Sequence, residues 1–165
     1  MSASPATTPD NILPAGTPAP DFALNATPDQ ALALHELRGK PVVLVFYPAD
    51  WSAVCGDELA LFNQALPMIA KSGATVVGIS VDSVWCHQAF ISARSLKFDL
   101  LADFHPKGDV ARLYGSYDEE HGYCKRSLYV IDAEGNIAWS YLSPTAINPG
   151  VDGVLDALDA LNKTA

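Results

Sequence analysis

The sequence predicts one α/β domain in which helices cover a central mixed β-sheet. Apolar runs with the composition of buried strands alternate with segments whose apolar residues recur at helical spacing. A hairpin pattern near the end of the chain adds antiparallel strands to this alternation. The length of 165 residues suits a single domain with its own core, and no internal repeat divides it.

The N-terminal region predicts a loose segment, a hairpin and then a buried strand. Residues 1–15 are rich in Pro, Ala, Ser and Thr, so we expect a flexible lead-in to a domain that spans 16–165. Short apolar pieces at 21–24 and 31–34 are expected to pair as a hairpin. The β-branched and aromatic run at 41–47 is typical of a strand buried on both faces.

A helix is expected directly after this strand. Ser52 is a good N-cap residue, and apolar residues recur at helical spacing from Leu59 to Ile69. Pro67 is expected to kink or end this helix, because proline removes a backbone donor and clashes with the preceding turn.

The rest of the chain continues the alternation of strands and helices. In chain order we expect a strand at 74–81, a helix at 84–96, a strand at 99–102, a short helix at 110–114, a strand at 127–131, a turn at 132–136, a strand at 137–142 and an amphipathic helix at 151–161.

Charge and composition exclude several classes of partner. The formal net charge of −9 disfavours nucleic acid and anionic membrane surfaces, which both require clustered Lys and Arg. No apolar stretch approaches the roughly 18 residues of a membrane helix. The N-terminus lacks the basic start and apolar run of a secretory signal, so a cytoplasmic location is expected.

The cysteines do not have the pattern of a secreted disulfide framework. Cys55, Cys86 and Cys124 form an odd, widely spaced set without a CxxC pair. This spacing disfavours a zinc site and a dithiol oxidoreductase, and we expect no bound metal.

Cys55 has the position that thiol chemistry needs. If Ser52 is the N-cap, Cys55 is the third helical residue, where unpaired backbone N–H groups and the helix dipole favour the thiolate. Asp57 and Glu58 oppose this effect with their negative charges, so a nearby cation is required. The alternative is that Cys55 is simply a small buried apolar residue.

The segment around Cys55 resembles the signature of the peroxiredoxin family. The signature places a Pro, then a Thr or Ser, before the peroxide-attacking Cys, as Pro48, Ser52 and Cys55 are placed here. The residues from Lys125 to Asp132 look like the family's arginine-bearing strand. The resemblance covers at least 16–142. It is strongest for the branch of one-cysteine alkyl hydroperoxide reductases and bacterioferritin-comigratory proteins.

The resemblance implies a thioredoxin-like fold and the thiol-dependent reduction of hydrogen peroxide and organic hydroperoxides, without a cofactor. Cys55 would attack the peroxide and become a sulfenic acid. Ser52 would bind the peroxide, Arg126 would hold the thiolate, and Pro48 would shield it from water. Glu58 would orient Arg126.

The chain departs from the family pattern at two positions. Gly56 stands where the family often has Pro, so the first helical turn is expected to be looser. Ser52 replaces the commoner Thr, which keeps the hydroxyl and removes the methyl group that restricts its rotamers.

The partner that reduces the sulfenic acid is expected to be an external thiol or a thioredoxin- or glutaredoxin-like protein. Cys86 is the preferred internal candidate for a resolving thiol, and Cys124 is a weaker one; both could also be packing residues. His87 either lines the rim of the site or packs in the core. The resemblance also implies a homodimer.

Two rival functions remain open at this point. A thioredoxin-like thiol–disulfide exchange protein is disfavoured by the absence of a CxxC pair. A peroxide-reactive redox sensor would use the same Cys55 but would be oxidised once without turnover.

Overall fold

The computed structural model describes residues 11–164. The strands are β1 (Ala23–Thr27), β2 (Gln30–Ala33), β3 (Val42–Phe46), β4 (Thr75–Ser80), β5 (Asp99–Ala102), β6 (Tyr117–Asp118), β7 (Tyr123–Cys124), β8 (Ser127–Ile131) and β9 (Ile137–Leu142). The helices are η1 (Leu34–Leu37, a 3₁₀ helix), α1 (Ala53–Ala70), α2 (Val84–Arg94), α3 (Asp109–Leu113) and α4 (Asp152–Thr164).

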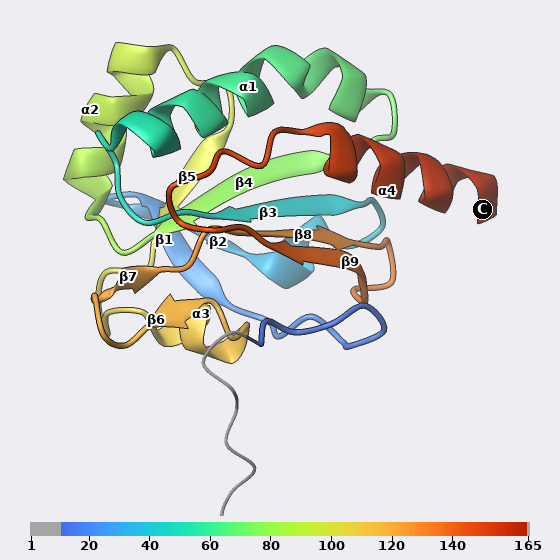
Figure 1. Ribbon diagram of the computed structural model, residues 1–165, viewed down its shortest axis with the longest axis horizontal. Coiled ribbons are helices and arrows are strands. Elements are labelled where there is room, and N and C mark those ends of the chain that lie inside the picture. Colours follow the sequence, from blue (N-terminus) through green and yellow to red (C-terminus); the bar gives the residue numbers. More distant parts are fainter. Residues whose placement is uncertain (1–10, 165) are drawn as a thin grey trace, which may run out of the picture.

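Seven strands form one mixed sheet in the order β2-β1-β5-β4-β3-β8-β9 (Figure 1). β3, β4 and β5 are parallel, whereas β8 and β9 continue the sheet as an antiparallel pair. β1 and β2 form the expected hairpin on the other side, and β1 pairs with β5. The mixed α/β sheet predicted from the sequence is confirmed.

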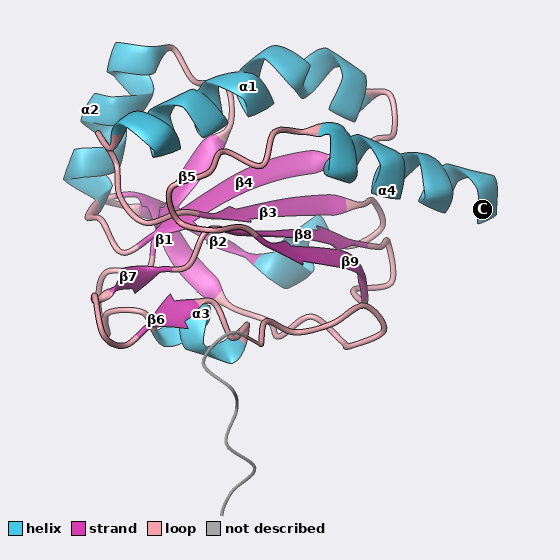
Figure 2. Cartoon of the chain, viewed as in Figure 1, coloured by secondary structure: helices cyan, strands magenta, loops and turns pink. Residues whose placement is uncertain are grey.

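Helices cover both faces of the sheet. α1, α2 and α4 lie over one face, and α3 lies over the other together with the small sheet of β6 and β7 (Figure 2). Successive residues of β3 point to opposite faces, so Val43 and Val45 enter the first core and Leu44 and Phe46 the second. The strand is therefore buried on both faces, as its continuous apolar run predicted.

The carboxyl ends of the parallel strands meet at one edge of the sheet. Phe46 at the end of β3 pairs with Ile79 of β4 and with Ser127 at the start of β8. The chain leaves β3 at this edge and enters α1 within a few residues, so the first turn of α1 lies beside the beginning of β8.

The expected elements are confirmed with boundaries shifted by a few residues, and three features differ. Pro67 was expected to kink or end the helix, but α1 continues through it to Ala70, so the alternative that the helix ends at Pro67 was wrong. Pro67 lies in the last turn, where Leu66 and Ile69 pack against the core and hold the helical conformation. η1 and the two-residue strands β6 and β7 were not expected, because such short elements have no periodic pattern.

Part of the expected lead-in is attached to the domain. Residues 1–10 lie outside the described residues. Of the remaining five, Leu13 donates its N–H to the carbonyl of Tyr114 at 3.1 Å, and Ile12 and Leu13 pack against the second core. In the part of the chain that the structure describes, none of the helices combines the length and the apolar character needed to cross a bilayer.

Candidate active site

The first turn of α1 presents Cys55 at the expected place. α1 begins at Ala53 with Ser52 as its N-cap, so Cys55 is the third helical residue. The Ser52 side chain makes no capping hydrogen bond, which leaves its hydroxyl available to a ligand. The turn is closed by the Gly56 N–H, which donates to the Ser52 carbonyl at 2.8 Å. Cys55 is completely buried.

Arg126 brings a positive charge to this turn from a distant part of the chain. It stands directly before β8, and its side chain is only 1% exposed. Its Nη2 donates to the sulfur of Cys55 at 3.4 Å, and its Nη1 donates to Oε1 of Glu58 at 2.9 Å. Its Nε donates to the carbonyl oxygen of Thr145 at 2.9 Å. The guanidinium is therefore fixed from three directions.

This arrangement surrounds the sulfur of Cys55 with positive charge. The cation that the sequence requires beside Cys55 is present, and the free N–H groups of the helix start add partial positive charge. Donors that are fixed in a water-poor site can stabilise negative charge without reorganising.

Glu58 is an unusual partner for the guanidinium. It is fully buried, and within residues 11–164 its Oε2 has no hydrogen-bond partner. Burial raises the pKa of Glu58 to about 7, even though the neighbouring Arg126 lowers it. Part of the Glu58 population therefore carries a proton near neutral pH. Asp57, the other acid of this turn, is exposed.

Pro48 lies in the loop between β3 and α1, two positions after the last residue of β3, and is buried. The expected role of Pro48 as a water shield for Cys55 remains a prediction. Trp51, later in the same loop, has a φ of 69°, in the left-handed region that costs a bulky residue about 1–2 kcal/mol.

A second buried polar cluster lies next to this loop. The Tyr47 hydroxyl donates to Oδ1 of Asp50 at 2.6 Å, and Nδ1 of His87 lies 2.7 Å from Oδ2 of Asp50. The other ring nitrogen of His87 lies 3.1 Å from the carbonyl oxygen of Leu101. His87 is fully buried, so it does not lie on the rim of the site.

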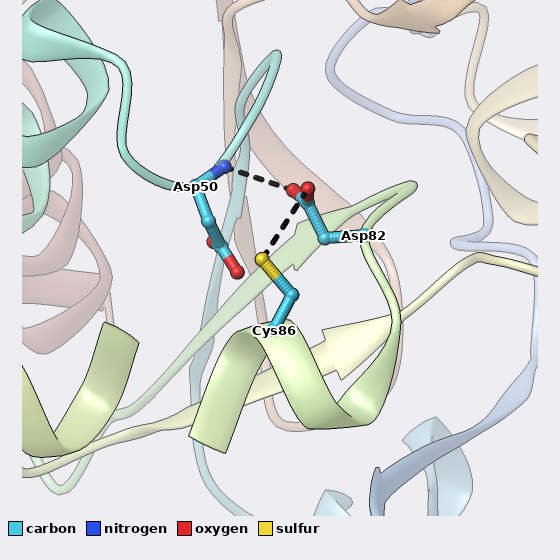
Figure 3. A group of neighbouring side chains, drawn as sticks. All are labelled: Asp50, Asp82 and Cys86. Carbon is cyan, nitrogen blue, oxygen red and sulfur yellow. Dashed lines mark hydrogen bonds between the residues drawn. The ribbon is translucent and has the colours of Figure 1, made fainter. Parts of the chain in front are cut away.

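Asp50, Asp82 and Cys86 bring three potential metal-ligating atoms within 4.8 Å of one another (Figure 3). However, the carboxylates are already used by protein donors. Oδ1 of Asp50 accepts from the Tyr47 hydroxyl, and Oδ2 of Asp50 faces Nδ1 of His87. Oδ2 of Asp82 accepts from the Asp50 N–H and from the Ser80 hydroxyl. The cluster is thus a hydrogen-bonded network, and its chemistry does not call for a metal.

The other two thiols are poorly suited to attack Cys55. The Cys86 sulfur donates to Oδ1 of Asp82 at 3.8 Å, and burial together with Asp50 and Asp82 raises its pKa to about 11. Cys124 is fully buried in the core on the opposite face of the sheet from Cys55, and burial raises its pKa well above the ordinary value.

The structure thus brings Cys55, Arg126 and Glu58 into contact, with Ser52 in the same turn. It leaves Cys124 apart and places His87 in the neighbouring cluster. Two participants were missed from the sequence. Thr145 contributes only a backbone carbonyl, for which no residue type is diagnostic. Asp50 acts through partners that lie far along the chain, which no local pattern indicates.

Comparisons with known proteins agree with this geometry. A family model described as "AhpC/TSA family" matches residues 15–140. The chain is similar to peroxiredoxin-2 of Rattus norvegicus, with 34% identity over 159 residues, covering 90% of this chain and 79% of that protein. It is also similar to alkyl hydroperoxide reductase E of Mycobacterium bovis, with 33% identity over 130 residues, covering 78% of this chain and 85% of that protein.

Solved structures show the same fold. The crystal structure of peroxidoxin BcpB from Mycobacterium tuberculosis superposes with a TM-score of 0.82 at 28% identity, covering 90% of this chain and 98% of that chain. The reduced 2-Cys peroxiredoxin of Plasmodium vivax gives a TM-score of 0.83 at 26% identity, covering 92% of this chain and 83% of that chain. The thioredoxin-like fold expected from the sequence is confirmed.

Glu58→Gln is expected to flatten the pH dependence of folding stability. The pKa of Glu58 is about 7 in the folded protein, against an ordinary value of 4.5. Between these values the folded chain keeps a proton that the unfolded chain releases. The contribution of Glu58 to wild-type stability therefore falls as the pH rises, by about 1.4 kcal/mol per pH unit and roughly 3 kcal/mol in total. Glutamine has no proton to lose, so this fall disappears.

Urea unfolding between about pH 4.5 and pH 7 measures this difference. The matched control is Asp57→Asn, which removes an exposed carboxylate one position earlier and keeps the wild-type slope. A Glu58→Gln variant with the wild-type slope would show that burial does not govern the ionisation of Glu58.

Proposed function

Because the chain belongs to the AhpC/TSA family of peroxiredoxins, we propose that Cys55 is the residue through which it reduces peroxides. Members of this family reduce hydroperoxides at the expense of thiols, through a cysteine sulfenic acid. The observation that carries the assignment to Cys55 is the contact of its buried sulfur with Arg126 Nη2 at 3.4 Å, in the first turn of α1.

The proposed reaction is a direct displacement on oxygen. The Cys55 thiolate attacks the terminal oxygen of the hydroperoxide, a sulfur–oxygen bond forms and the oxygen–oxygen bond breaks. The leaving oxygen takes up a proton and departs as an alcohol or water, while the sulfur is oxidised by two electrons to the sulfenic acid. Ser52 donates its hydroxyl to the peroxide, Arg126 stabilises the charge that moves across it, and Pro48 limits access of water.

Glu58 supports this step through Arg126. The carboxylate accepts from Nη1 of Arg126 at 2.9 Å, while Nη2 of the same group points to the sulfur. Since the guanidinium is planar, fixing Nη1 also fixes the direction of Nη2. Glu58 is a positioning residue in this proposal.

Recycling is proposed to use an external thiol or a thioredoxin- or glutaredoxin-like protein. Cys86 is largely protonated at neutral pH, with a pKa of about 11, and the thiol itself is a poor nucleophile. Cys124 lies on the other face of the sheet. Since the sulfur of Cys55 is fully buried, the first turn of α1 has to open before an external thiol can reach it.

The proposed assembly is a homodimer that forms at the edge of the sheet next to Cys55. Exposed large apolar side chains follow the strand ends at this edge: Trp51 after β3, Trp85 after β4, Phe104 after β5 and Ile147 after β9. Each is more than half exposed, and burial of such a group in a second copy would remove much apolar surface from water. A cytoplasmic location is proposed because the reaction requires a supply of reduced thiols.

Cys55→Ser is expected to lower peroxide turnover by more than about 1,000-fold, since the serine hydroxyl is not a nucleophile toward peroxide at neutral pH. Consumption of hydrogen peroxide and of an organic hydroperoxide with excess dithiothreitol measures the rate. Cys86→Ser is the matched control and keeps turnover within about threefold of wild type. Substantial turnover by Cys55→Ser would remove the assignment.

The recycling route is tested on wild-type protein treated with one equivalent of peroxide. We expect mass spectrometry to find a trappable sulfenic acid at Cys55, because neither remaining thiol is poised to condense with it. The reduced protein treated in the same way without peroxide is the control. A mapped disulfide from Cys55 to Cys86 or Cys124 would instead establish an internal resolving thiol.

Trp85→Glu is expected to shift the protein from dimer to monomer, because a carboxylate at the centre of an apolar contact would lose its hydration. Sedimentation velocity measures the change against the monomer mass of 17.5 kDa. Met68→Glu is the control, since Met68 is 55% exposed in the last turns of α1, away from this edge. A monomeric wild type, or dissociation by Met68→Glu alone, would contradict this interface.

A further inference from the structure

The loop between β3 and α1 adopts a conformation that needs support from its surroundings. Trp51 has a φ of 69°, which is unfavourable for a bulky side chain. It directly precedes Ser52, the N-cap of α1, and lies four positions before Cys55. The backbone at Trp51 therefore decides where the Ser52 hydroxyl and the first turn of α1 lie.

Asp50 fixes this loop from three sides. Its Oδ1 accepts from the Tyr47 hydroxyl at 2.6 Å, its Oδ2 lies 2.7 Å from Nδ1 of His87, and its own N–H donates to Oδ2 of Asp82 at 2.9 Å. Asp50 is 6% exposed, and the rings of Tyr47 and His87 are fully buried. A buried carboxylate keeps such partners firmly, since their loss would leave it unpaired in a dry environment.

His87 connects Asp50 to the sheet. Its Nε2 lies 3.1 Å from the carbonyl oxygen of Leu101 in β5. A carbonyl oxygen only accepts hydrogen bonds, so Nε2 carries a proton and the ring orientation is defined. With Nδ1 facing Asp50, the imidazole bridges β5 and the loop and cannot turn without breaking both contacts.

α2, the helix that carries His87, also contacts the side chain of Trp51. The ring of Trp51 packs edge-on against Phe90, with 5.1 Å between the ring centroids. Phe90 follows His87 by three positions on α2, so both lie on the helix face that meets the loop. Backbone and side chain of the loop are therefore held by one rigid element.

We propose that His87 is a positioning residue for peroxide reduction, which acts through Asp50 to hold the loop that presents Ser52 and Cys55. The inference rests on the proposed function of Cys55 and deepens it. Among the described residues, no hydrogen bond joins His87 to Ser52 or Cys55, so His87 acts through the backbone. If the loop moved by about 1 Å, the Ser52 hydroxyl and the Cys55 sulfur would no longer be aligned with the peroxide for attack on its terminal oxygen.

The test compares two rate constants of Cys55 in His87→Phe and wild type. Oxidation by hydrogen peroxide, followed in single-turnover stopped-flow experiments, is expected to fall about 100-fold. Alkylation by iodoacetamide is expected to stay within about threefold or to rise, because it needs a thiolate but no oriented Ser52. A purely structural defect that removed the thiolate would lower both rates together.

Asp50→Asn provides rescue by a conservative change. The amide oxygen still accepts from Tyr47, and the amide N–H₂ can donate to Nδ1 of a neutral His87, so the loop stays in place. Its peroxide rate is expected to remain within about fivefold of wild type. Gln88→Ala, at an exposed position of α2, is the control and keeps both rates.

Tyr47→Phe is the alternative test of the same proposal if His87→Phe does not fold. It removes one donor to Asp50 and preserves the ring, and its peroxide rate is expected to fall about tenfold with alkylation unchanged. Wild-type peroxide rates in both variants, or parallel losses of both rates, would overturn the role of His87. Failure of wild type itself to react with peroxide would overturn the proposed function instead.

Discussion

A buried guanidinium is the interaction on which the arrangement of this site depends. Arg126 is 1% exposed, and an unpaired cation in such a place would cost several kcal/mol. Its donors are satisfied by Glu58 in α1, by the carbonyl of Thr145 in the loop after β9, and by the sulfur of Cys55. The cation therefore joins the start of α1 to two segments that lie far along the chain.

The reactive turn is held from a second side by α2. His87 and Phe90 contact the loop at Asp50 and Trp51, and the Arg94 guanidinium lies against Gly56 in the first turn of α1. Arg126 approaches the same turn from the β8 side of the sheet. Contacts on two sides explain how the loop can keep the unfavourable backbone of Trp51, since tertiary contacts offset its local cost.

The sequence was sufficient to predict what local patterns encode. The buried strand at 41–47, the N-cap at Ser52 and the helical position of Cys55 follow from composition and spacing within a few residues, and all three are present. Arg126 could be identified only by resemblance, because 71 positions separate it from Cys55 and no local pattern indicates such a contact. The role of Arg126, like those of Ser52 and Pro48, remains a prediction.

The network around Asp50 could not have been predicted for a different reason. Nothing in the sequence distinguishes His87 as a bridge from a histidine that simply packs, since the distinction lies in which acceptors face its two nitrogens. The left-handed backbone at Trp51 was equally hidden, because that conformation is normally expected at glycine. Both features come from tertiary contacts, so they appear only once α2 and β5 are in place.

Gly56 shows how the chain balances reactivity against recycling. The contacts that orient Cys55 toward peroxide also bury the sulfenic acid that forms, so the turn has to open for a reducing thiol. A Cβ at position 56 would lie 2.8 Å from Nη2 of Arg94, so glycine allows the guanidinium to pack against the turn. Glycine also weakens a helical turn by about 1 kcal/mol relative to alanine, which lowers the free energy of opening. Besides its own backbone bond from Gly56 to Ser52, the turn is thus held by side chains from α2 and by Arg126, directly before β8, and its glycine lowers its resistance once those side chains separate.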